Sequence, residues 1–77
     1  SKIALGVYPN PVVNWLTITS DHFLEEINVY SMTGELIHAF RSKSNLAMID
    51  CSSWPPGTYS LIAITAEGRV AMPFVKR

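Results

Sequence analysis

The sequence predicts an all-β fold, an antiparallel β-sandwich of immunoglobulin-like type with about seven strands. Short segments in which apolar and polar residues alternate recur along the whole chain, which is the pattern of half-buried strands. Turn signals separate these segments at spacings of roughly 8–12 residues, which is typical of a sandwich or barrel. No stretch of about ten residues keeps a 3.6-residue period with helix caps, so we expect almost no helix.

Size and composition indicate one small folded domain covering residues 1–77. The chain is 48% hydrophobic and 16% charged, so it is too apolar to be disordered. Six basic residues balance six acidic ones, and a neutral domain has no charge with which to gather phosphates, so we expect no nucleic-acid partner. No apolar run approaches the roughly 18 residues that span a bilayer. Ser1 follows no initiator Met, which suggests a piece of a longer protein.

The first two strands are predicted on either side of a proline corner. Residues 3–7 alternate as a strand and lead into Tyr8-Pro9-Asn10-Pro11. Proline fixes φ and pushes the preceding residue out of the helical region, so this segment is a stiff, pre-shaped corner. Residues 15–19 alternate again, with Thr17 and Thr19 on the face expected to meet solvent.

The middle of the chain predicts a hairpin. Ser20-Asp21-His22 reads as a polar turn, and residues 23–26 are the only plausible single helical turn. Residues 27–30 then form a strand whose partner is residues 36–40. Thr33-Gly34 lies between them and predicts a tight turn, because Gly can adopt a positive φ.

The last third predicts three more strands, at residues 46–50, 58–65 and 70–75. A polar turn at residues 42–45 precedes the first of them, and Ser52 to Gly57, which contains Pro55-Pro56, forms a rigid connection. Pro73 lies inside the final strand, where it removes a ladder donor. We therefore expect this strand to lie at a sheet edge or to carry a bulge, and an edge can pair with another chain.

The residue types of a nucleophilic triad are present, but we predict no enzyme and no catalytic residue. Cys51 lies between Asp50 and Ser52, and the two histidines are His22 and His38. A triad needs an oriented base and an oxyanion site, and a thin sandwich offers little room for the cleft that holds them. Cys51 is better interpreted as a small apolar residue that packs inward at a strand end. The ligand spacings of a zinc or calcium site are absent, so we expect no metal and no cofactor.

The two tryptophans and the terminal cations have functional and structural interpretations, whereas Tyr59 has one. Trp15 is expected on the exposed face and could stack on a sugar, whereas Trp54 is more simply a plug over one end of the core. Tyr59 is expected in the core with its hydroxyl on a backbone partner. Lys76 and Arg77 are either solvated charges that keep the edge soluble or a recognition handle.

Taken in order, several of these motifs resemble one known family. The series runs from Tyr8-Pro9-Asn10-Pro11 through the strand–turn–strand of residues 27–37 and Ile49-Asp50 to Pro56-Gly57-Thr58-Tyr59, and ends in a strand at Lys76. It is similar to the type A C-terminal sorting domains of the type IX secretion system of Bacteroidetes, over residues 7–76. The resemblance assigns recognition to seven positions, namely Pro9, Asn10, Pro11, Gly34, Gly57, Tyr59 and Lys76.

The resemblance implies that the domain is a sorting signal, an address for export, rather than an enzyme. It implies that residues 1–77 are the C-terminal sorting domain of a larger exported protein that passes through the periplasm. The implied partners are the outer-membrane translocon with its shuttle protein and a surface sortase of the cysteine-peptidase type. The implied destination is the outer membrane, the cell surface or the extracellular space. The free edge also makes a strand-paired or swapped homodimer possible.

Two other function classes stay open on the sequence. One is a retained immunoglobulin-like module that binds carbohydrate, with Trp15 as the stacking platform, or mediates adhesion. The other is a docking domain in a component of the secretion apparatus or of its signalling branch. Mass measurement of the mature surface protein separates a removed address from a retained module.

Overall fold

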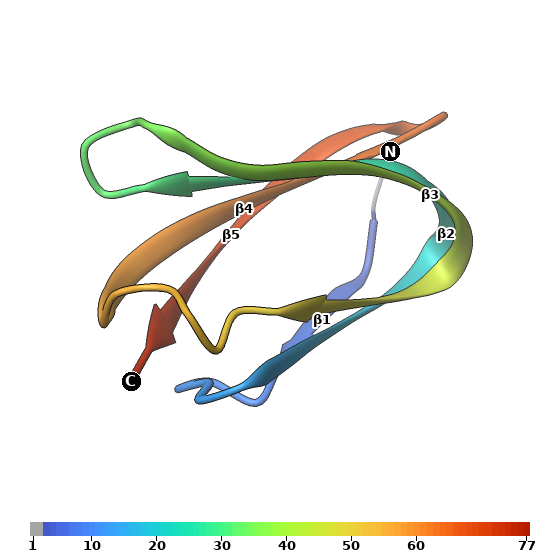
Figure 1. Cartoon of the computed structure of the whole chain (residues 1–77). Coiled ribbons are helices and arrows are strands. Elements are labelled where there is room, and N and C mark those ends of the chain that lie inside the picture. The colour runs from blue at the N-terminus through green and yellow to red at the C-terminus, as the bar shows by residue number, and fades with distance from the viewer. Residues whose placement is uncertain (1–2) are drawn as a thin grey trace.

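The computed structural model of the protein describes residues 3–77, so Ser1 lies outside the described part. In that part the chain forms one antiparallel sheet and no helix, which confirms the all-β prediction (Figure 1). No helix in residues 3–77 is therefore long and apolar enough to cross a membrane. The five strands are β1 (Leu5–Tyr8), β2 (Trp15–Ser31), β3 (Leu36–Asp50), β4 (Gly57–Thr65) and β5 (Gly68–Lys76).

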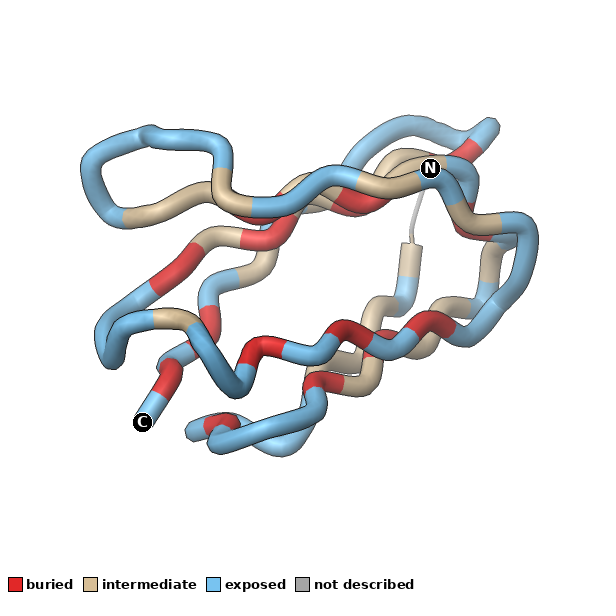
Figure 2. Tube along the Cα trace, in the orientation of Figure 1, coloured by how far each residue is buried: buried red, intermediate tan, exposed pale blue. Residues whose placement is uncertain are grey.

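The sheet curls because β2 and β3 are long and bend together. The first part of β2 pairs with β1 and with the end of β3, as in the pairs Thr17–Tyr8 and Thr17–Met48. The second part of β2 pairs with the start of β3 and with β4, and β5 pairs with β4. The two halves of the curled sheet face each other in Figure 1, with buried residues on the inner side of both halves in Figure 2.

The prediction of seven strands is wrong, because two predicted turns lie inside strands. Residues 20–22 belong to β2 and residues 42–45 belong to β3. Neither segment contains Gly or Pro, so the chain bends through register shifts between Thr19 and Glu26 instead of reversing. Two pairs of predicted strands thus merge into two long ones. The single helical turn predicted at residues 23–26 is also wrong, because these residues continue β2.

The core lies between the two halves of the sheet. Its fully buried side chains come from both halves, and each contributes about 1.5–3 kcal/mol by leaving water. The largest of them are Phe74, Leu16, Ile18, Leu24, Ile27, Leu61, Val12 and Val29. Cys51 is a free, buried thiol, so the domain has no disulfide and depends on this packing.

The last strand lies at a sheet edge, as Pro73 predicts. β5 pairs with β4 along its length and meets one further residue, Val12, at its end. The N–H of Val75 points away from β4, because it donates to Asn10. Backbone groups alternate in direction along a strand, so the nitrogen of Pro73 also faces outward. Pro73 therefore costs the β4–β5 ladder no hydrogen bond, and it leaves one fewer donor on the outer edge.

Candidate docking surface

Hydrogen bonds join the proline corner to the last strand at one end of the molecule. The side-chain oxygen of Asn10 accepts a hydrogen bond from the backbone N–H of Val75 at 2.9 Å. Val12 donates its N–H to the carbonyl of Val75 and accepts from the N–H of Arg77, both at 2.8 Å. A short parallel bridge thus pairs Val12 with Lys76. The segment from Asn10 to Val12 covers the outer edge of β5 where the strand ends.

Pro9 and Pro11 are exposed on either side of Asn10, and both follow cis peptide bonds. Because each proline fixes its own φ, the corner is rigid on both sides of the Asn10 side chain. Val12 and Val75 carry the bridge, but the sequence did not single them out. An apolar residue just after a rigid corner was the signal for Val12, and nothing local indicated that it pairs with Lys76, 64 positions away.

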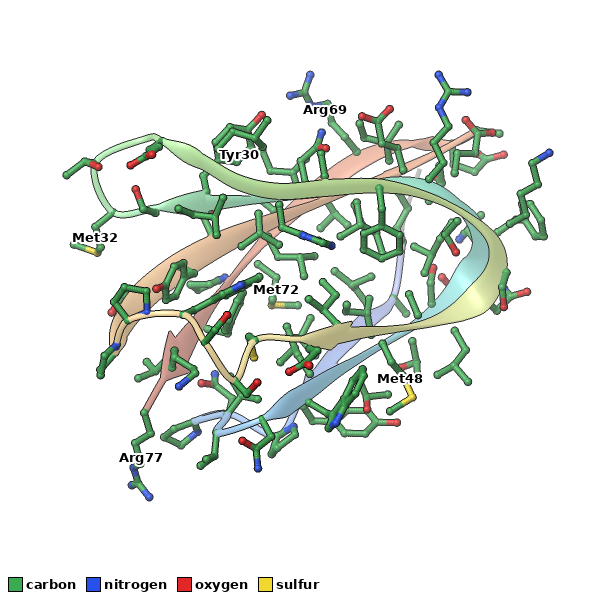
Figure 3. The ribbon with its side chains drawn as sticks, viewed as in Figure 1. Tyr30, Met32, Met48, Arg69, Met72 and Arg77 are labelled. Atoms are coloured by element: carbon green, nitrogen blue, oxygen red, sulfur yellow. The ribbon has the colours of Figure 1, made fainter. Side chains whose placement is uncertain are left out.

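The side chain of Lys76 is buried, so it is not the solvated charge that one of the two sequence interpretations expects. It is 6% exposed, and its ammonium donates to the carbonyl oxygen of Arg77 at 2.6 Å. A buried charge needs such a partner. Arg77 is exposed and points away from the sheet in Figure 3. The exposed cation at this end is therefore Arg77, and the side chain of Lys76 is buried.

Gly57 and Tyr59 bring the β3–β4 loop to the same end. Gly57 lies opposite Lys76 in the β4–β5 ladder. Tyr59 is buried as predicted, and its hydroxyl donates to the carbonyl of Pro55 at 2.5 Å. Its ring stacks on Phe74, with centroids 5.6 Å apart, and burial raises the pKa of its hydroxyl. Trp54 packs partly buried against the core and against Tyr59, which confirms its role as a plug.

Gly34 lies apart from the corner, at the turn between β2 and β3. Its φ is +88°, as the turn prediction requires. Its N–H donates to the carbonyl of Ser31 at 3.0 Å, and Ser31 in turn receives an N–H bond to its hydroxyl from Glu35. A groove of about 320 Å³ separates this hairpin from the β3–β4 loop and extends as far as Gly57 and Tyr59. Six of the seven predicted recognition residues therefore belong to one connected end, and Gly34 lies across the groove from it.

The triad residue types do not assemble in residues 3–77. Cys51 is buried, and its thiol donates to the carbonyl of Asn14 at 3.2 Å. Burial raises the pKa of this thiol, despite the opposing positive charge of Lys76. His38 lies against Phe40 and Trp54 through ring contacts. The interpretation of Cys51 as a packing residue is confirmed.

His22 lies in β2 rather than in a turn, and its ring bonds to the carboxylate of Asp21 at 2.8 Å. Asp21 also accepts the N–H of Ala4 at 2.9 Å, so it links β2 to the chain just before β1. These hydrogen bonds lower the pKa of Asp21. No group of three metal-ligating side chains gathers anywhere in the described residues 3–77.

A second surface lies on the outer face of the half that contains β1. Trp15 is 53% exposed there, in agreement with the prediction. Tyr8, Thr17 and Met48 form one cross-strand row, which places their side chains on a common face. Leu46, two residues from Met48, shares that face, and Met48 points outward in Figure 3. This outer face thus gathers several exposed large apolar side chains.

The arrangement is that of a compact all-β module whose first and last motifs meet at one end. The chain belongs to the family of secretion system C-terminal sorting domains, whose model matches residues 6–76. The resemblance drawn from the sequence is thereby confirmed. The domain is a C-terminal sorting signal of type IX secretion and interacts with the secretion machinery. Cargo of this system reaches the outer membrane, the cell surface or the extracellular space, and a sorting domain is not normally catalytic.

A solved structure shares this fold. It is PorZ, an essential bacterial surface component of the type-IX secretion system of Porphyromonas gingivalis from the human oral microbiome. The TM-score is 0.82 at 16% sequence identity, and the match covers 96% of this chain and 11% of PorZ. The chain thus corresponds to about a tenth of the length of that protein. No protein of curated function matches the sequence.

Proposed function

We propose that the outer-membrane translocon of type IX secretion recognises this domain in its folded form, at the end where the proline corner meets the last strand. In this proposal residues 1–77 are the C-terminal sorting domain of a larger exported protein. The family match over residues 6–76 supports it. The two facing halves of the sheet also support describing the fold as an immunoglobulin-like sandwich.

The observation that carries the proposal is the bond between Asn10 and Val75. It joins the motif at Pro9 to Pro11 to the strand that ends in Lys76, so two short motifs become one surface. A folded domain displays shape and backbone edges that an unfolded peptide lacks. The exposed prolines and Arg77 are the parts of this end that a partner can touch, while Gly57, Tyr59 and Lys76 hold them in place. Gly34 shapes the neighbouring hairpin.

The same proposal includes the route by which the cargo is exported. The cargo passes through the periplasm, where a shuttle protein and the translocon receive it, and a surface sortase of the cysteine-peptidase type removes the domain. The sortase acts on the chain that precedes the domain. Mass measurement of the mature surface protein tests this step, because the proposal predicts that residues 1–77 are missing from it.

The direct test of the address is truncation of a secreted reporter fused to the domain. Removing residues 75–77 deletes the strand end that Asn10 and Val12 bind, so we expect the reporter to accumulate in the periplasm. A matched reporter with the intact domain gives the secreted reference. Normal export of the truncated fusion would show that this end is not the recognised surface.

The retained-module alternative has one observation in its favour, the exposed face with Trp15, Tyr8 and Met48. Aromatic rings on a sheet face suit sugar stacking. If the domain remains on the mature protein and Trp15→Ala abolishes glycan binding, this alternative replaces the address. A strand-paired homodimer would use β3, which pairs only with β2 within residues 3–77 and so keeps one free edge.

A further inference from the structure

The last part of β3, residues 46–50, is an open sheet edge. In the described residues β3 pairs only with β2, and no Cα atom of another strand comes within 8 Å of its Cα atoms (Figure 1). The N–H of Cys51 points to β2, because it donates to the carbonyl of Asn14. Backbone groups alternate in direction along a strand, so those of Met48 and Asp50 point away from β2. Both residues therefore present an N–H and a C=O at the edge.

Leu46 has the same direction as Met48 and Asp50. Its N–H already has a local acceptor, the hydroxyl of Ser44 at 3.1 Å, while its C=O points outward with theirs. The edge thus offers the C=O groups of Leu46, Met48 and Asp50 and the N–H groups of the last two. No strand of residues 3–77 pairs with these groups.

The other edges of the sheet are protected against pairing with another chain. β5 contains Pro73 and is covered at its end by the proline corner. β1 has only four residues, and the earlier part of β3 carries Arg41 and Lys43. Short length, proline and charged side chains are the usual devices that keep an edge from pairing. Residues 46–50 contain no proline, and their only charge is that of Asp50, so this edge has none of that protection over most of its length.

The side chains beside this edge are apolar and exposed. Leu46 and Met48 are 52% and 55% exposed on the outer face, and Met48 projects outward in Figure 3. Thr17 and Tyr8 continue the row of Met48 across β2 and β1. A strand added to β3 would cover part of Leu46 and Met48 and so remove apolar surface from water.

We propose that this edge pairs with the same edge of a second copy of the chain, antiparallel and centred on Met48. Met48 then exchanges both of its N–H···O=C bonds with the second copy's Met48. The C=O of Leu46 accepts the N–H of the second copy's Asp50, and the twofold axis repeats this bond. Reversal about Met48 therefore matches donors with acceptors while both chains keep their own fold.

Charge and the shape of β3 select this partner and this register. The formal net charge of the chain is zero, so two copies do not repel each other. A register with Asp50 opposite Asp50 would place like charges side by side. A register with Leu46 opposite Leu46 would move the pairing into residues 42–45, where β2 and β3 bend. Centring on Met48 overlaps the straight stretches completely and brings the two methionines into contact.

The pairing is weak and leaves the proposed recognition surface open. Two copies of residues 46–50 make a much smaller contact than the roughly 1,200 Å² of stable complexes, so we expect a Kd on the order of 0.1–1 mM. β1 and this edge lie on opposite sides of β2, so the corner from Pro9 to Pro11 stays exposed in both copies. The inference rests on the edge of β3 and not on translocon recognition. Dimerisation in solution and export in cells can therefore succeed or fail independently.

Sedimentation of the 77-residue chain from about 10 μM to about 1 mM measures the dimer, and amide exchange at the same concentrations locates it. We expect exchange at Met48 and Asp50 to slow as the concentration rises. The amides of Ala47 and Ile49 point to β2, so they should exchange slowly throughout. A chain that stays monomeric at about 1 mM, or new protection confined to other strands, would overturn the proposal.

Met48→Lys places two like charges opposite each other at the centre of the pairing. It is expected to weaken dimerisation roughly five- to tenfold, and the exposed position spares the core. Met32→Lys is the matched control, because Met32 is 76% exposed in the turn between β2 and β3, and it should leave dimerisation unchanged. Equal dimerisation of the Met48→Lys chain and the original would overturn the proposal. A dimer that separates only after unfolding would have exchanged strands and would also overturn it.

Discussion

Asn10 and Val75 are 65 positions apart in the sequence, yet the side-chain oxygen of Asn10 accepts the backbone N–H of Val75 at 2.9 Å. This bond occupies a donor at the edge of β5 that would otherwise meet only water. It also fixes the orientation of the proline corner relative to the last strand. The fold, the edge and the proposed recognition surface meet at this contact.

Asn10→Ala removes this acceptor and leaves the N–H of Val75 to solvent. We expect a loss of about 1 kcal/mol in the free energy of unfolding, because the bond is exposed and water replaces part of it. Chemical denaturation measures the loss, and amide exchange should become faster at Val75 in particular. Asn45→Ala is the control, since the Asn45 side chain also bonds the backbone, donating to the carbonyl of Ser20. A mutant in which exchange at Val75 is unaltered contradicts this account of the edge.

Gly34→Ala tests the turn of the hairpin. A Cβ at Gly34 would meet no atom within 4 Å, so the cost of the substitution comes from its φ of +88° alone. We expect a destabilisation of about 1–2 kcal/mol, measured by thermal unfolding. Gly34→Asn should cost less, because Asn tolerates a left-handed backbone. Equal losses for the two variants would show that backbone conformation is not the cause.

Tyr59→Phe deletes one hydroxyl and keeps the ring. The ring still stacks on Phe74 and contacts Trp54, while the carbonyl of Pro55 loses its donor. The expected loss is about 1 kcal/mol or slightly more, because the hydroxyl is partly buried. The signals of Trp54 and the loop should broaden or shift in NMR spectra. A variant as stable as the original would mean that water replaces the phenol without penalty.

The carboxylate of Asp21 makes the stability of the domain depend on pH. Because folding lowers the pKa of Asp21 through its bonds to His22 and Ala4, the native state favours the carboxylate more than the unfolded chain does. This stabilisation is present above the usual carboxyl pKa and is lost as the pH falls through the lowered one. Urea midpoints of Asp21→Asn and of the original should therefore differ near pH 7 and converge at about pH 2. A gap between the two midpoints that stays constant with pH would refute the role of Asp21.

Cys51 should react slowly with alkylating reagents in the folded domain. It is buried, and its raised pKa leaves little thiolate at neutral pH. We expect iodoacetamide to label it much faster after unfolding in urea, as mass spectrometry would record. Comparable labelling rates in the two states would place the thiol at the surface and reopen the nucleophile interpretation.

Local chemistry made much of this fold predictable. Alternation identified part of each of the five strands, Gly34 predicted its positive φ, Pro73 predicted an edge and Tyr59 predicted a buried ring with a backbone acceptor. In each case the residue itself carries the constraint. The family resemblance depended on such residues in order, and the match to residues 6–76 confirms it.

The sequence predictions that failed have one common cause. They concern features that depend on residues far apart in the sequence. Polar residues 20–22 and 42–45 look like turns, and only the pairing of β2 with β3 on both sides of these residues shows that they are bends. Lys76 looks like a solvated end, because the sequence does not reveal that Val12 pairs with it and covers it. The groove between the β2–β3 hairpin and the β3–β4 loop depends on the packing of segments distant in sequence, which no periodicity encodes.

The export of a reporter fused to the Asn10→Ala domain tests the central claim most directly. Fractions from cells expressing this fusion, the Asn45→Ala fusion and the unmodified fusion are compared at a temperature at which all three domains are folded. The account predicts that only the Asn10→Ala reporter accumulates in the periplasm. Secretion of that reporter at the same level as the other two would contradict it.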